Sequence, residues 1–154
     1  YRTAPVNNEY IAVFASRPSY ISLEYALSAY GLIPEYVPNI TLVTTKRPGT
    51  LKFSEGMYIY RHIMPKLFWG YTARGEKNFE TFFAEPEKAL LDIFYFTKGE
   101  LTIEYMEEMR FQNTAIIDQE KLTKYAERFG HPRIIKAARV FLQYAANEKG
   151  MKEL

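Results

Sequence analysis

The sequence predicts an α+β domain with an N-terminal helix, an antiparallel β meander and a helical C-terminal half. Residues 19–30 and 84–96 show helical spacing of apolar side chains between clear start and stop signals. Residues 39–84 contain short β-branched and aromatic segments separated by turns, and helical spacing returns after residue 100. A chain of 154 residues is expected to form a single domain, spanning residues 1–154.

The first helix is predicted over residues 19–30. Ser19 is a favourable N-cap, and Gly31 and Pro34 stop the helix. One face carries an apolar stripe made of Leu23, Ala26, Leu27 and Tyr30. The short apolar run over residues 9–15 fits either a strand or a first helical turn.

The strands are predicted in the middle of the chain, where β-branched and aromatic residues alternate between turns that contain glycine or proline. Pro48-Gly49 and Glu55-Gly56 mark the first two turns. The expected strands are residues 40–45, 51–53, 57–64, 67–71 and 79–84. Because short turns join consecutive strands, an antiparallel meander is the expected topology.

The second half of the chain is predicted to be helical. Pro86 suits the first position of a helix, and Lys88 and Asp92 are spaced to form an i,i+4 ion pair on it. Further helices are expected to begin near Thr102, Asp118 and Pro132, the last of them running to about Ala146.

The composition restricts the possible functions. The chain has a net charge of +2 and no cysteine, which excludes disulfides, thiolate catalysis and cysteine-ligated metals and is typical of a cytoplasmic protein. No apolar run approaches the ~20 residues needed to cross a bilayer, so no membrane partner is expected. His62 and His131 are the only histidines and lack the spacing of a metal-binding pair. We therefore expect no metal and no cofactor.

One acidic cluster permits an enzymatic alternative. Glu85, Glu87 and Asp92 lie close to Lys88 in the sequence, and a metal-dependent nuclease combines such carboxylates with a lysine around a divalent ion. Each of these residues also suits a helix start or an i,i+4 pair, so a structural explanation exists as well. The alternative to a non-catalytic function is thus a metal-dependent nuclease that uses Glu85, Glu87, Lys88 and Asp92.

Seven basic residues are candidate contacts for nucleic-acid phosphates or for an acidic protein partner. Three lie at or near a predicted hairpin tip, where loops often carry recognition. The other four lie in the C-terminal region, where no acidic residue occurs between Arg128 and Asn147. The set is Lys46, Arg47, Lys52, Arg128, Arg133, Lys136 and Arg139. Ordinary solvated surface charge is the other explanation for both groups.

Several of these segments, taken in order, resemble the AbiEi family, the antitoxins and transcriptional regulators of type IV abortive-infection toxin–antitoxin systems. The similarity covers about residues 1–100. The segments that carry it are Ser19–Glu24, Gly31–Glu35, Ile40–Thr44, Tyr58–Ile63, Phe68–Tyr71 and Ala84–Asp92.

The resemblance implies a role in phage defence without catalysis. Such a domain would contribute to neutralising a nucleotidyltransferase-like toxin and to autorepression of its operon. In this family a winged helix-turn-helix domain typically precedes the matching region, and Tyr1-Arg2-Thr3 resembles the end of its wing. Operator DNA would then be bound mainly by that preceding domain, and no catalytic residue is carried over. A structural or oligomerisation module is a third alternative.

Overall fold

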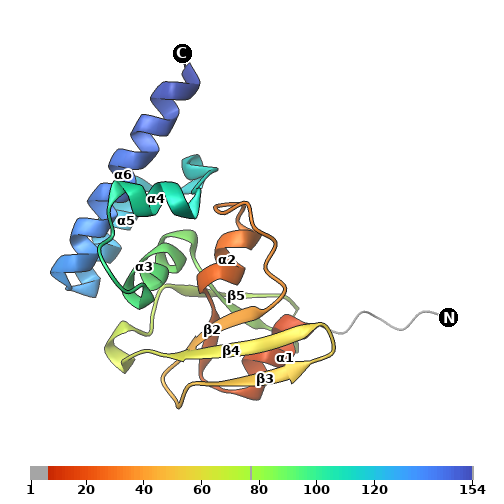
Figure 1. The fold of residues 1–154 in the computed structure, drawn as a ribbon. Helices are drawn as coiled ribbons and strands as arrows, with labels where there is room; N and C mark the ends of the chain where they lie inside the picture. Colours follow the sequence, from red (N-terminus) through yellow and green to blue (C-terminus); the bar gives the residue numbers. More distant parts are fainter. Residues whose placement is uncertain (1–6, 77, 154) are drawn as a thin grey trace.

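The computed structural model describes residues 7–76 and 78–153 and confirms the α+β class (Figure 1). Within these residues, six strands form one sheet, and the chain is helical from Pro86 onward except for its loops. One helix lies on one face of the sheet, and the C-terminal helices gather on the other side (Figure 1). No helix of the described ranges is both long enough and apolar enough to cross a membrane.

The sheet has the strand order β3-β4-β2-β1-β6-β5. Its strands are β1 (Ser19–Ile21), β2 (Ile40–Thr44), β3 (Gly49–Phe53), β4 (Gly56–His62), β5 (Tyr71–Arg74) and β6 (Thr81–Ala84). β1 and β2 occupy the centre, and every residue of both strands is buried. β3 lies at one edge and is almost entirely exposed.

The predicted antiparallel meander is wrong at two pairings. β2 pairs with β4 in parallel, and β1 pairs with β6 in parallel, whereas the other three pairings are antiparallel. Short turns predict that strands consecutive in the sequence pair with each other, but burial decides which strand lies in the centre of the sheet. The exposed β3 folds back on the outer side of β4, so β4 takes the place beside the apolar β2.

The helix predicted over residues 19–30 is shorter than expected. Residues 19–21 form β1, and α2 runs over Leu23–Ala29 after Ser22. The Thr41 hydroxyl accepts a hydrogen bond from Tyr25 N (3.0 Å) and donates one to Ser22 O (2.6 Å), so a β2 side chain caps the helix. This leaves the hydroxyl of Ser22 free for another partner.

The apolar run at residues 9–15 forms a helix, α1 (Asn8–Ala15), and not a strand. Its N-cap is Asn7, whose side chain accepts from Tyr10 N. The hydroxyl of Tyr60 in β4 donates to Ala12 O, which fixes α1 on this face of the sheet. Tyr20 of β1 points to the opposite face, where its hydroxyl contacts α3.

The C-terminal helices follow the predicted start signals. They are α3 (Pro86–Phe96), α4 (Ile103–Met109), α5 (Gln119–Phe129) and α6 (Pro132–Glu153). Thr102 caps α4 by accepting from Tyr105 N, and Asp118 caps α5 by accepting from Lys121 N. α6 continues past the expected end at Ala146 and projects from the body (Figure 1).

Two short 3₁₀ segments complete the described chain, η1 (Pro65–Leu67) and η2 (Thr114–Ile116). η1 replaces the start of the strand predicted at residues 67–71, because Pro65 favours a tight turn and the next strand begins only at Tyr71.

Buried tyrosines should make the fold sensitive to high pH. Burial raises the pKa of Tyr60 to about 12 from its ordinary value of 10.0. A raised folded-state pKa contributes stability that is complete below pH 10 and is lost as the pH rises toward 12. We expect Tyr60→Phe to lower the free energy of unfolding at neutral pH and to flatten its fall above pH 10, measured by urea unfolding across this range. Parallel pH curves for the two proteins would contradict this assignment.

Candidate functional site

The centre of the Ala84–Asp92 segment is a buried ion pair between Lys88 and Asp92. Both side chains have no exposed surface, and Lys88 Nζ lies 2.8 Å from Asp92 Oδ1. The nitrogen also donates to the hydroxyl of Tyr20 (2.7 Å) and to Leu67 O (2.9 Å), so all three ammonium protons are used. Asp92 Oδ2 accepts from the hydroxyls of Tyr20 and Ser22, each at 2.8 Å. The i,i+4 pair predicted from the spacing is confirmed, but its complete burial was not predicted.

The segment Phe68–Tyr71 packs around the same ion pair. Lys88 Nζ lies 4.9 Å from the ring centre of Trp69, and the Phe68 ring packs edge-on against Tyr20. Gly70 has φ +82°, and a Cβ at this position would lie 2.7 Å from Lys88 Cγ. Only glycine therefore fits here, because it allows both the left-handed backbone and the close approach of the lysine stem.

Burial changes the pKa values of Lys88 and of its hydrogen-bond partner Tyr20. Burial lowers the pKa of Lys88, and the neighbouring Asp92 carboxylate partly offsets this. Burial, together with the charge of Asp92, raises the pKa of Tyr20 well above its ordinary value. At neutral pH the Tyr20 hydroxyl is therefore neutral. It can donate a hydrogen bond to Asp92 and accept one from Lys88.

Replacing one member of this pair should lower the free energy of unfolding far more, per substitution, than replacing both. Lys88→Met leaves the Asp92 carboxylate buried without a cation, and we expect a loss of about 3–5 kcal/mol in the free energy of unfolding. Asp92→Asn leaves the buried ammonium without a counter-charge and should cost a similar amount. The double variant should be destabilised by much less than the sum, as measured by urea unfolding. Additive losses would show that the two charges do not act as a pair.

The other two residues of the suggested nuclease set hold α5 against α3. Glu85 accepts from the hydroxyl of Tyr125 (2.6 Å) and forms an ion pair with Lys121. Glu87 is 3% exposed and accepts from Asp118 N (2.9 Å). Both carboxylates thus contact the start of α5, which explains why acidic residues occur at these positions.

This geometry gives the nuclease alternative no support. Lys88 and Asp92 cannot contact a substrate phosphate, because they lie in the core and pair with each other. Across residues 7–76 and 78–153, no group of three or more histidine, aspartate or glutamate side chains is arranged to hold a metal ion. The acidic set is therefore explained by folding.

Arg133, one of the seven predicted contacts, is used inside the structure. Its guanidinium donates to the carbonyl oxygens of Phe94 (3.0 Å), Thr97 and Gly99 (2.6 Å). These carbonyls lie at and after the C-terminal end of α3, where helices leave acceptors unpaired. Arg133 thus ties α6 to α3 and uses three of its five N–H donors within the protein.

Substitutions on α6 should show that Arg133 contributes to stability while its exposed neighbours do not. We expect Arg133→Met to lower the free energy of unfolding by about 2–3 kcal/mol, because three carbonyl groups lose a charged donor. Lys136→Met and Arg139→Met, both on exposed positions of the same helix, should change it by less than about 0.5 kcal/mol. Equal effects of all three variants in urea unfolding would contradict the capping role of Arg133.

Three of the C-terminal basic residues remain exposed. Arg128, at the end of α5, lies with its guanidinium carbon 4.1 Å from the ring centre of Trp69, on the rim of the core. Lys136 and Arg139 lie one turn apart on α6. We call Arg128, Lys136 and Arg139 the α6 basic surface, and none of them takes part in an ion pair among the described residues.

The other predicted group lies at the opposite part of the molecule. Lys46 and Arg47 are exposed in the turn between β2 and β3, and Lys52 is exposed on the edge strand β3. The parallel pairing of β2 with β4 places Thr44 opposite His62, and His62 Nδ1 lies 3.1 Å from Lys46 O. The antiparallel pairing with β1 brings Ser19, and with it Arg17, to the same end of the sheet.

The six exposed residues of the set thus belong to two separate surfaces. α6 packs mainly against α3, α4 and α5, whereas Lys46 and Arg47 lie in the β2–β3 turn and Lys52 lies on β3 (Figure 1). Sequence reasoning missed Arg17, because only strand pairing brings it near Lys46. The sequence did contain a signal for the basic surface around Lys46, since residues 40–54 and 56–75 contain no aspartate or glutamate.

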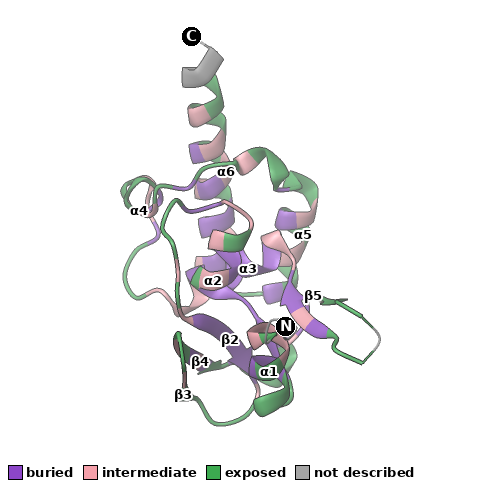
Figure 2. Cartoon of the chain, turned by 90° about the vertical axis from the view of Figure 1, so that its right-hand side faces the viewer, coloured by how far each residue is buried: buried purple, intermediate pink, exposed green. Residues whose placement is uncertain are grey.

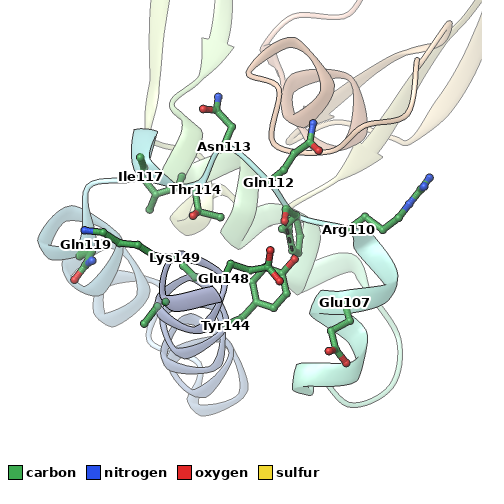
Figure 3. A pocket seen from close by; sticks show the side chains of 15 residues that line it. Glu107, Arg110, Gln112, Asn113, Thr114, Ile117, Gln119, Tyr144, Glu148 and Lys149 are labelled. Carbon is green, nitrogen blue, oxygen red and sulfur yellow. Dashed lines mark hydrogen bonds between the residues drawn. The ribbon is translucent and has the colours of Figure 1, made fainter. Parts of the chain in front are cut away.

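One hollow of the described surface, with a volume of about 1170 Å³, lies between α4, residues 110–117 and the second half of α6. Tyr144 lies at its base, where its hydroxyl donates to Phe111 O (2.7 Å) (Figure 3). Charges of both signs surround it, from Glu107, Arg110, Glu148 and Lys149. This open groove carries no charge pattern that selects one kind of partner.

Comparisons of the chain with models of known protein families, with curated proteins and with solved structures found no match. The resemblance to the AbiEi family therefore rests on the ordered sequence segments alone. The structure adds that three of these segments, Ser19–Glu24, Phe68–Tyr71 and Ala84–Asp92, meet around Lys88.

Proposed function

We propose that this chain is a non-catalytic antitoxin and transcriptional-regulator domain of the AbiEi type. It contributes to neutralising a nucleotidyltransferase-like toxin and to autorepression of its operon. A winged helix-turn-helix domain that precedes this region contacts most of the operator DNA. The module acts in the cytoplasm, in bacterial defence against phage.

One observation carries this proposal: the acidic side chains of the Ala84–Asp92 segment are engaged inside the fold, while exposed cations without carboxylate partners remain outside. Lys88 and Asp92 have no exposed side-chain surface, so a substrate in solvent cannot contact them. A cation on a rigid helix keeps its charge for a partner, and such charges mainly set the rate of association and its salt dependence.

The α6 basic surface is the part of the chain that we assign to the toxin. Lys136 and Arg139 are exposed on a helix that is fixed in place by Arg133 in its first turn and by buried apolar residues such as Phe141. Their positions are therefore set by the core and not by flexible loops. An acidic face of the toxin is the matching partner.

The test is growth rescue in bacteria that express the nucleotidyltransferase-like protein encoded beside this chain. We expect the chain to restore growth and the Lys136→Glu/Arg139→Glu variant to rescue about tenfold to a hundredfold fewer cells, because two charges then repel the acidic face. Thermal unfolding of the purified variant checks that its fold is intact.

The matched control is Lys46→Glu/Arg47→Glu, which changes the charge by the same amount at the other end of the molecule. It should rescue growth as well as the unchanged chain does. Failure of the unchanged chain to restore growth would refute the antitoxin function. Full rescue by the Lys136→Glu/Arg139→Glu variant would remove the α6 basic surface from the toxin contact.

A further inference from the structure

A second cavity of about 360 Å³ opens between α1, the start of β1 and the β5–β6 hairpin. This volume lies at the lower end of the roughly 300–1,000 Å³ that is typical of small-ligand sites. α1, most of whose residues are exposed or half-buried, packs against β1 and β6 (Figure 2). The cavity is distinct from the Lys88 cluster and from the α6 basic surface.

Aromatic rings line much of this cavity. Phe68, Tyr71 and Phe82 form an aromatic wall of rings packed edge to face, with ring centres 5.2 Å apart for Phe68 and Tyr71 and 5.6 Å apart for Tyr71 and Phe82. Tyr10 of α1 also lines it and packs edge-on against Phe79, which is 54% exposed. Such rings offer flat faces on which any nucleobase can stack.

Two polar side chains lie among these rings. Asn78 and Glu80, both exposed, line the cavity on the loop side before β6. An amide can pair with the edge of adenine, and a carboxylate accepts from an exocyclic amino group such as that of cytosine. The carboxylate of Glu80 repels phosphate, so a phosphate group must approach from the opposite side.

That opposite side is basic. Arg17 lines the cavity, and its guanidinium carbon lies 4.6 Å from the ring centre of Phe14. Ser19, also a lining residue, pairs with Thr44, whose hydroxyl accepts from Lys46 N (3.1 Å) and donates to Pro18 O (2.7 Å). Lys46 and Arg47, which follow Thr44, are thus exposed at the same end of the sheet as Arg17, and residues 40–54 contain no carboxylate.

We propose that this cavity binds one unpaired nucleotide of a single-stranded nucleic acid. The base stacks on the Phe68–Tyr71–Phe82 wall and on Tyr10. Asn78 and Glu80 contact the edge of the base. The flanking phosphates lie against Arg17, Lys46 and Arg47. This site does not require the antitoxin function, since it uses different residues from the α6 basic surface.

The shape of the site favours a single strand over a duplex. In a duplex the bases are stacked on each other, and only their edges are accessible in the grooves. A cavity that is lined by ring faces needs a base that has left its stack. Arg17, Lys46 and Arg47 fit a chain of phosphates better than an apolar peptide, which would leave these three cations without partners.

The proposal can be tested by fluorescence anisotropy with labelled homo-oligonucleotides of about twelve nucleotides. We expect cytidine and adenosine strands to bind more tightly than thymidine strands, because thymine has no exocyclic amino group for Glu80. Tyr10→Leu should weaken binding about fivefold to a hundredfold, since one stacking face is lost while the side chain stays apolar. Three phosphate contacts predict a slope of about −2 for log affinity against log salt.

Charge reversals supply the matched controls. Lys46→Glu/Arg47→Glu should weaken strand binding and flatten the salt slope to about −0.7, because only Arg17 then remains. Lys136→Glu/Arg139→Glu should leave strand binding unchanged. Glu80→Gln should reduce the preference for cytidine strands over thymidine strands without abolishing binding.

Three results would overturn the proposal. The first is that Tyr10→Leu binds the strand as tightly as the unchanged chain. The second is that the matching duplex binds as tightly as the strand or more tightly, and the third is that mononucleotides compete as strongly as the strand. These outcomes are independent of the growth assay. A chain that rescues growth but binds no strand would refute the nucleotide site alone, and the reverse pattern would refute the antitoxin function alone.

Discussion

The fold depends on the buried ion pair between Lys88 and Asp92. Taking the two charges out of water costs several kcal/mol per ion, and only good geometry offsets this. Here each polar atom of the pair has a partner, and the partners outside α3 come from β1, from Ser22 before α2 and from the η1 segment. Segments that lie 68 and 70 residues apart in the chain are thereby fixed relative to one another. An apolar core alone would tolerate small shifts between these elements, whereas hydrogen bonds to a buried charge do not.

Both surfaces to which we assign partners adjoin this cluster. The Tyr20 ring stacks on Tyr71 with ring centres 4.9 Å apart, so the wall of the aromatic cavity is supported by a residue that bonds to Lys88 and Asp92. On the other side, Trp69 packs near Lys88 and under Arg128, which connects the cluster to α5. Recognition sites are more precise when the core positions them, and the two sites here share one support.

The sequence predicted the helices well because their signals are local. Thr102 and Asp118 cap helices at the expected positions, since an N-cap bonds within three residues. The sheet was predicted less well, because the parallel β1–β6 and β2–β4 pairings join segments that no short turn connects. The role of Arg133 also escaped prediction, since its acceptors follow α3, more than thirty residues earlier. The burial of Lys88 was hidden for the same reason: β1 and η1 supply the partners that remove it from solvent.

The small net charge of +2 conceals an uneven distribution of charge. Exposed carboxylates concentrate on α4 and α5, for example at Glu104, Glu108 and Glu120, whereas residues 40–54 and 56–75 have none. Salt screens exposed charges beyond roughly 8–10 Å at physiological ionic strength, so a partner responds to the local surface and not to the sum over the chain. α3 and the sheet separate the α6 basic surface from the end of the sheet that holds Lys46 (Figure 1). The toxin contact and the strand site that we propose therefore use different cations.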